Sequence, residues 1–118
     1  MEYLLMIYDE EKVWAKMSDS ERGKLMAGYG TFTKEIVASG HMRGGNALQS
    51  VSTATTVRVR DGKTLSTHGP FAETREQLGG YYLIEAKDLD EATAIAARIP
   101  SARVGSIEIR PVQPMTAM

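Results

Sequence analysis

The chain has 118 residues, which fits one domain, and its composition of 42% hydrophobic and 25% charged side chains is ordinary for a globular protein. The formal net charge is −1 and no basic stripe stands out, so direct nucleic-acid binding is not expected. The absence of cysteine excludes disulfides, thiolate nucleophiles and cysteine metal sites, and it fits a reducing compartment.

The first residues predict a buried strand and no export signal. Residues 2–8 carry apolar side chains on both faces, which is typical of a central strand covered on both sides. Acidic side chains stand where a signal peptide needs lysine or arginine. The apolar run is also far shorter than the ~20 residues that a membrane helix requires. We therefore expect a cytoplasmic protein with no membrane partner.

Two helical segments are expected before residue 40. Residues 10–17 suggest a short helical turn, and Ser18 with Glu21 forms a capping box for a longer helix over residues 19–39. Apolar side chains recur along that helix at steps of three and four, and Gly40 marks its end. The stripe consists of Leu25, Met26, Tyr29, Phe32, Ile36 and Val37.

The middle of the chain predicts strands and a hairpin. Residues 46–50 suggest a short strand, and residues 55–60 alternate as a half-exposed strand does. The dipeptide Asp61-Gly62 is a strong tight-turn signal because both positions accept positive φ. We therefore expect residues 64–67 to return as the second strand of a hairpin.

The last third predicts a strand, a helix and a strand. Residues 79–86 are apolar on both faces, as in the first strand. Asp88 suggests a helix cap, and Pro100 stops the helix that follows. Residues 105–112 then alternate as a final strand.

This order of elements predicts one α+β domain over residues 1–118. It is a ferredoxin-like β-α-β-β-α-β sandwich with an inserted hairpin. Two helices can cover only one face of such a sheet, yet residues 3–8 and 81–86 carry apolar side chains on both faces of their strands. A second copy of the chain is the simplest cover, so we expect a homodimer.

The candidates for chemistry begin with a histidine at a rigid bend. No catalytic signature such as GxSxG, HExxH or a phosphate loop is present, and neither a metal nor a cofactor is expected. His68 precedes Gly69, Pro70 and Phe71, and a histidine there can act as an acid or base near neutral pH. The alternative is a strand-end histidine that makes a local hydrogen bond.

A second set of candidates lies on the strands. Glu108 and Arg110 share one face of the last strand, opposite two isoleucines, and would point into the second face of the sheet. A carboxylate and a guanidinium in a dimer cleft can bind a polar ligand, whereas an exposed ion pair would contribute little stability. The phenols of Tyr8 and Tyr82 could reach the same face and donate a hydrogen bond there, although packing is the more common role of tyrosine at such sites.

Much of the sequence resembles a known family. The strongest similarity lies in residues 68–86, HGPFAETREQLGGYYLIEA, which resemble the signature of the DGPF-domain proteins, a branch of the YCII-related family. The similarity continues in residues 88–112, in residues 53–63 and in the opening EYLLMIYDEE. This resemblance implies a dimeric α/β-barrel of ferredoxin-like subunits. It also implies kinship with small-molecule isomerases and monooxygenases, and an association with extracytoplasmic-function sigma factors.

Two positions depart from the family pattern. His68 replaces the aspartate of the DGPF motif, whereas Gly69, Pro70 and Phe71 match it. The wider family carries a His–Asp pair suspected of catalysis, but residues 19–39 hold no histidine to supply it.

Two functions follow as hypotheses. The first is a dimer-associated cleft that binds an unknown small molecule, with or without catalysis, in which His68 carries a proton and Arg110 anchors an anion. Its further ligand-binding candidates are Gly69, Pro70, Phe71, Glu73, Tyr82 and Glu108. The second is a non-enzymatic regulatory module that binds protein and is linked to extracytoplasmic-function sigma factors.

Overall fold

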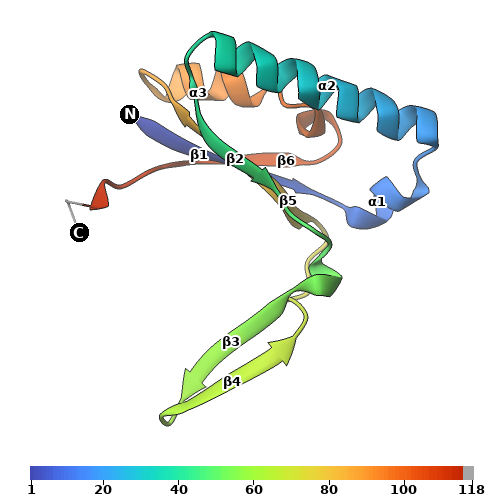
Figure 1. Ribbon diagram of the computed structural model, residues 1–118, viewed down its shortest axis with the longest axis vertical. Coiled ribbons are helices and arrows are strands. Elements are labelled where there is room, and N and C mark those ends of the chain that lie inside the picture. The colour runs from blue at the N-terminus through green and yellow to red at the C-terminus, as the bar shows by residue number, and fades with distance from the viewer. Residues whose placement is uncertain (116–118) are drawn as a thin grey trace.

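The computed structural model describes residues 1–115 as a four-stranded sheet with helices on one face and a separate two-stranded hairpin (Figure 1). In chain order the elements are β1 (Glu2–Asp9), α1 (Glu11–Lys16), α2 (Asp19–Ala38), β2 (Met42–Ala47), η1 (Val51–Thr53), β3 (Thr55–Arg60), β4 (Lys63–His68), β5 (Gln77–Glu85), α3 (Leu89–Ala96), η2 (Pro100–Arg103) and β6 (Ser106–Pro111), where η denotes a short 3-10 helix. This is the mixed α+β class that the sequence predicts. None of the helices within residues 1–115 is long and apolar enough to cross a membrane.

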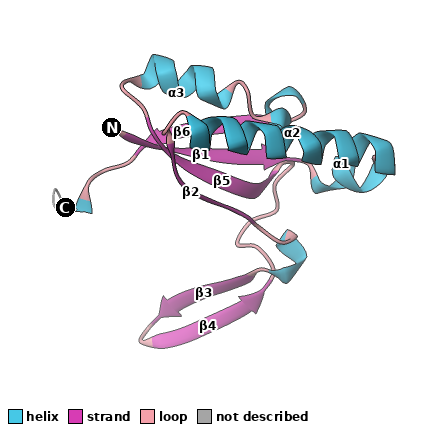
Figure 2. Cartoon of the chain, turned by 45° about the horizontal axis from the view of Figure 1, so that its top comes forward, coloured by secondary structure: helices cyan, strands magenta, loops and turns pink. Residues whose placement is uncertain are grey.

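The sheet has the strand order β2-β5-β1-β6, and every neighbouring pair in it is antiparallel. Helix α2 connects β1 to β2, and α3 connects β5 to β6, so each helix joins two strands that lie on either side of a third. Figure 2 shows both helices on the same face of the sheet. That face therefore holds the core.

The core fills the space between the helices and the sheet because β1 and β5 alternate between two faces. On β1, Tyr3, Leu5 and Ile7 are buried beneath the helices, whereas Leu4 and Met6 are half-buried on the opposite face. The other buried apolar residues come from α2, β5, α3 and the segments beside them: Phe32, Ile36, Ile84, Ala86, Ala92, Ile95, Ala96 and Ile99. We call the opposite side, which no helix covers, the open face.

Local signals placed several elements correctly. Ser18 and Glu21 form the expected capping box at the start of α2. The β3–β4 hairpin turns through Asp61 and Gly62, which have φ values of 52° and 74°. The positive φ angles confirm the tight turn that the dipeptide predicts.

Two boundaries differ from the expectation. The strand expected at residues 46–50 is β2, which runs from Met42 to Ala47, where Gly44 pairs with Leu83 of β5. Glycine has a low intrinsic propensity for β-strands, but here the hydrogen bonds to the central strand β5 stabilise the extended conformation. Helix α3 ends at Ala96, and the chain continues into the 3-10 helix that begins at Pro100.

Candidate functional site

A cavity of about 860 Å³ opens on the helix-facing side of the sheet, between α1, α2 and strands β1, β5 and β2. This volume lies within the range of small-molecule sites. Tyr29 and Thr33 of α2 lie along one side of it, and Trp14 of α1 along another. The sheet contributes Ile7 of β1 and Tyr82 of β5.

Two glycines keep the sheet side of the cavity open. Gly80 pairs with Ile7, and Gly45 pairs with Tyr82, so both glycines stand where a helix-facing side chain would project. A Cβ at Gly80 would lie 2.9 Å from the carbonyl oxygen of Asn46, and one at Gly45 would lie 2.9 Å from that of Tyr81. Because both contacts are too short for a real Cβ, the strands pack closely only with glycine at these positions.

Asp9, Glu11 and Lys12 are the charged residues that line the cavity, and Asp9, the last residue of β1, is only 7% exposed. Its Oδ2 accepts hydrogen bonds from Trp14 Nε1 at 2.8 Å and from Ser101 Oγ at 3.0 Å. Its Oδ1 has no hydrogen-bond partner within residues 1–115, and none of the side-chain nitrogens and oxygens described is both fully buried and unpartnered. Oδ1 is therefore not fully buried, and Asp9 is one of the residues that line the cavity.

The Tyr29 phenol extends the hydrogen-bond network around Asp9. Tyr29 OH donates a hydrogen bond to Ser101 Oγ at 2.6 Å, and Ser101 is fully buried. Burial raises the pKa of the Tyr29 phenol, and the nearby charge of Asp9 raises it further, although the hydrogen bond to Ser101 opposes the rise. The phenol therefore stays protonated at neutral pH and remains a donor. Two hydrogen bonds in series thus link Tyr29 to Ser101 and Ser101 to the accepting carboxylate of Asp9.

Two further pairs of polar side chains in the cavity lining are joined by hydrogen bonds. Thr33 Oγ1 and Tyr82 OH are 2.7 Å apart, and Asn46 Nδ2 donates to Tyr81 OH at 2.7 Å. Lys12 adds a cation to the lining. Residues 1–115 hold no group of three or more histidine, aspartate or glutamate side chains that could bind a metal ion.

The DGPF-like segment lies outside this cavity. His68 is the last residue of β4, opposite Thr55, and is exposed; within the described chain its ring makes no hydrogen bond. Gly69 has a φ of 103°, and its carbonyl accepts a hydrogen bond from Thr56 Oγ1 at 2.8 Å. Beyond it, Pro70, Phe71 and Glu73 are exposed.

The strand candidates divide between the two faces of the sheet. Glu108 and Arg110 pair with Met6 and Leu4, so they lie on the open face, as their alternation predicts. Tyr82 instead faces the helices, where its ring packs edge-on against Phe32 with centroids 5.1 Å apart. Tyr82 does not reach the open face, because it shares the helix-facing side with Ile84, and it has the packing role that is more common for tyrosine.

The structure therefore brings only Tyr82 of the sequence-based candidates to the cavity. Sequence reasoning missed Asp9, Trp14, Tyr29 and Ser101. A carboxylate directly after an apolar strand, five residues before the only tryptophan, was a usable signal for Asp9. No local pattern points to Ser101, which lies 92 residues away in the chain.

Comparison with known proteins identifies the family. The model of the YCII-related domain matches residues 1–116. The chain belongs to the YCII-related family. A YCII-related relative, the uncharacterized protein R00369 of Rhizobium meliloti (strain 1021), is 35% identical over 114 residues, which cover 95% of this chain and 92% of the relative.

A solved structure shows the same fold at low identity. It is 5-chloro-2-hydroxyhydroquinone dehydrochlorinase from Burkholderia phenoliruptrix AC1100, in complex with 2,5-dihydroxybenzoquinone. It aligns with a TM-score of 0.58 and 12% identity over 99% of this chain and 98% of its own. The likeness supports a mixed α/β fold with antiparallel strands for this YCII-related protein.

Proposed function

We propose that this YCII-related protein binds a small planar molecule bearing a hydroxyl group in the cavity beside Asp9. The observation that carries this proposal is the Asp9 carboxylate in the cavity lining, whose Oδ2 is held by two donors while Oδ1 accepts no hydrogen bond within residues 1–115 and is not fully buried. A carboxylate oxygen is an acceptor, so its complement is a ligand donor such as a hydroxyl.

The cavity lining favours a ring as the body of the ligand. Trp14, Tyr29 and Tyr82 contribute aromatic surface, and Met26 and Met42 contribute thioether groups that adapt to flat shapes. The solved neighbour of the same fold was determined with a dihydroxybenzoquinone, which supports a hydroxylated ring as the ligand class.

Proton transfer is the chemistry that we assign to this arrangement. Asp9 accepts a proton from the ligand hydroxyl, or from a ligand carbon whose acidity the ring raises, because its free oxygen is the acceptor on that side. Trp14 and Ser101 hold the carboxylate in one orientation while the proton moves. The role of His68 as a proton carrier stays a separate prediction, as does a sigma-factor-linked regulatory function.

We also propose that two ferredoxin-like subunits pack sheet against sheet in a two-fold dimeric α/β-barrel. The support is the open face, where Leu4, Met6 and Leu83 are only half-buried in one chain. Apolar surface of this kind is stabilised by association. Sedimentation at micromolar concentration should give about twice the 12.9 kDa chain mass, and a clean monomer would contradict the barrel.

Resorcinol and its dimethyl ether, 1,3-dimethoxybenzene, test the ligand proposal. Both are flat rings, but only resorcinol can donate to Asp9 Oδ1. Because a hydrogen bond to a charged group contributes ~1.5–3 kcal/mol, resorcinol should bind roughly 10- to 150-fold more tightly. Trp14, the only tryptophan of the chain, lines the cavity, so quenching of its fluorescence reports occupancy. Equal affinities, or binding that leaves Trp14 emission unchanged, would contradict the proposal.

A further inference from the structure

The β3–β4 hairpin, residues 55–68, which we call the arm, stands away from the rest of the molecule. Figures 1 and 2 show it projecting from the end of β2 and β5 to the side of the sheet opposite the helices. The radius of gyration is 16.4 Å, whereas a compact chain of this length would have about 13.5 Å. The arm and the open face thus form two sides of an angle.

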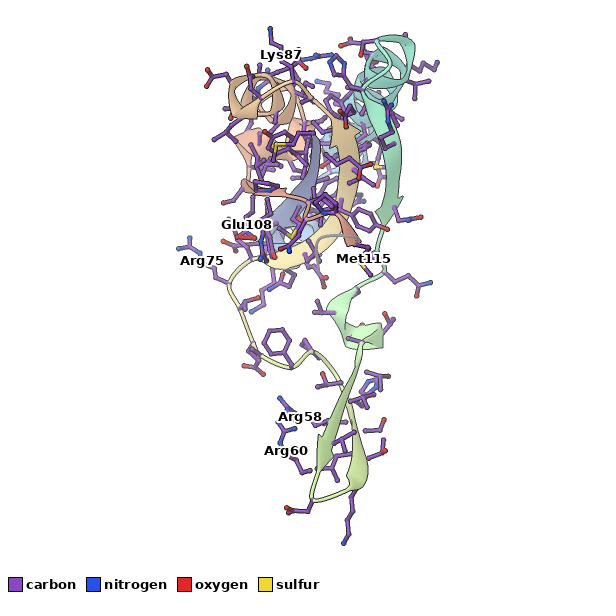
Figure 3. The ribbon with its side chains drawn as sticks, turned by 90° about the vertical axis from the view of Figure 1, so that its left-hand side faces the viewer. Arg58, Arg60, Arg75, Lys87, Glu108 and Met115 are labelled. Carbon is purple, nitrogen blue, oxygen red and sulfur yellow. The ribbon has the colours of Figure 1, made fainter. Side chains whose placement is uncertain are left out.

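The two faces of the arm differ in charge. The pairing register places Arg58 opposite Leu65 and Arg60 opposite Lys63, and these residues make up what we call the basic face. The pairs of Val57 with Ser66 and Val59 with Thr64 form the other side, which we call the neutral face. Figure 3 shows Arg58 and Arg60 pointing from the arm to the side on which Glu108 of the sheet lies.

Charge is distributed unevenly between the arm and the remaining chain. The arm holds Arg58, Arg60 and Lys63 against the single carboxylate Asp61, which gives +2. Because the whole chain carries −1, the remaining residues carry −3. None of the three cations takes part in an ion pair within residues 1–115.

The arm also lacks support of its own. A two-stranded hairpin is at best marginally stable alone in water, and every residue of β4 is exposed. Next to its root, Gly69 N donates to Ala54 O at 2.7 Å and Val51 N to Glu11 Oε2 at 3.0 Å. Burial of either face requires another surface.

We propose that the arm clasps a second copy of this chain, with its basic face against acidic side chains of the partner. The inference rests on the proposed dimer. A partner packed on the open face would occupy the angle between that face and the arm, on the side to which Arg58 and Arg60 point. The residues outside the arm carry a net charge of −3 in the partner as well, which complements the arm, whereas the same net negative charge would repel a polyanion such as nucleic acid.

A pair of double variants tests the clasp through the dissociation constant of the dimer. Arg58→Gln/Arg60→Gln removes two charges from the basic face, and Thr64→Glu/Ser66→Glu, the matched control, lowers the net charge equally on the neutral face. Sedimentation of a dilution series at low salt should show roughly three- to thirtyfold weaker dimerisation for the first variant and a change within about twofold for the second. High salt should remove most of the difference. Equal effects of the two variants would overturn the proposal.

Cross-linking distinguishes the clasp from the dimer itself. A carbodiimide joins the Lys63 amine to a carboxylate in contact with it, and an equal mixture of unlabelled and 15N-labelled chains identifies cross-links between copies. Mixed peptides containing Lys63 are expected. A wild-type dimer whose Lys63 links only within its own chain would overturn the clasp alone and leave the basic face to another partner. A wild-type monomer would overturn both the clasp and the dimer.

Discussion

The replacement of Ser101 by alanine tests the network that holds the Asp9 carboxylate. Ser101 is fully buried, accepts a hydrogen bond from Tyr29 and donates one to Asp9. The variant removes the hydroxyl and adds no bulk, so the change in the free energy of unfolding reports the two hydrogen bonds rather than a large cavity.

The magnitude follows from what each partner loses. Asp9 Oδ2 loses a charge-assisted hydrogen bond, for which ~1.5–3 kcal/mol is typical, but keeps the one from Trp14. The Tyr29 hydroxyl loses a neutral hydrogen bond, but Tyr29 lines the cavity and can turn to water there. We therefore expect Ser101→Ala to lower the free energy of unfolding by about 2–3 kcal/mol, a large fraction of a typical 5–15 kcal/mol.

Urea unfolding of Ser101→Ala, Tyr29→Phe and the double variant provides the assay. If the three groups act as a chain, the effects of the single variants should not add, and the coupling energy should be about 1 kcal/mol. A loss below about 0.5 kcal/mol for Ser101→Ala, or strict additivity, would refute the network as described.

Three further predictions concern the core, a titration and the hairpin. Phe32→Ala should cost ~3–5 kcal/mol in urea unfolding because Phe32 is buried, whereas Arg110→Ala, exposed on the open face, should cost less than about 1 kcal/mol in the same assay. The raised pKa of Tyr29 contributes stability below its unfolded value of 10.0 that is lost as pH rises through the folded value, so unfolding measured above pH 10 should depend less steeply on pH in Tyr29→Phe. His68→Ala should leave resorcinol affinity within about twofold by calorimetry, since His68 does not line the cavity; a large loss, partly restored by His68→Asp, would instead support the proton carrier.

Much of the fold could be predicted because local signals and pattern agree. The capping box at Ser18, the Asp61-Gly62 turn and the two-faced strand at residues 2–8 each act within a few residues, and each is present. The limits of β2 could not be predicted, because Gly44 and Gly45 adopt strand geometry only through pairing with β5. Where the pairing strand is distant in the sequence, the strand propensity of single residues does not predict the limits of a strand.

The site was harder to predict than the fold, because it is assembled from distant parts of the chain. Asp9, Tyr29 and Ser101 come from β1, α2 and η2, and no spacing links them. The cavity itself depends on side chains that are missing, at Gly45 and Gly80, and a pair of glycines in the sequence indicates either a turn or a close approach of the backbone without locating a cavity. His68 was a candidate because of its residue type and its place before a Gly-Pro bend. Neither property carries information on where the cavity lies.

The affinity of Asp9→Asn for resorcinol tests the central claim most directly. The asparagine oxygen can still accept from Trp14 and Ser101, while its amide nitrogen replaces the free Oδ1, so the acceptor at the cavity becomes a donor. Glu108→Gln makes the same chemical change on the open face and serves as the control. Calorimetry should show roughly 10- to 150-fold weaker binding for Asp9→Asn and wild-type affinity for Glu108→Gln. Wild-type affinity in a folded Asp9→Asn protein would contradict the assignment of Asp9 as the ligand's acceptor.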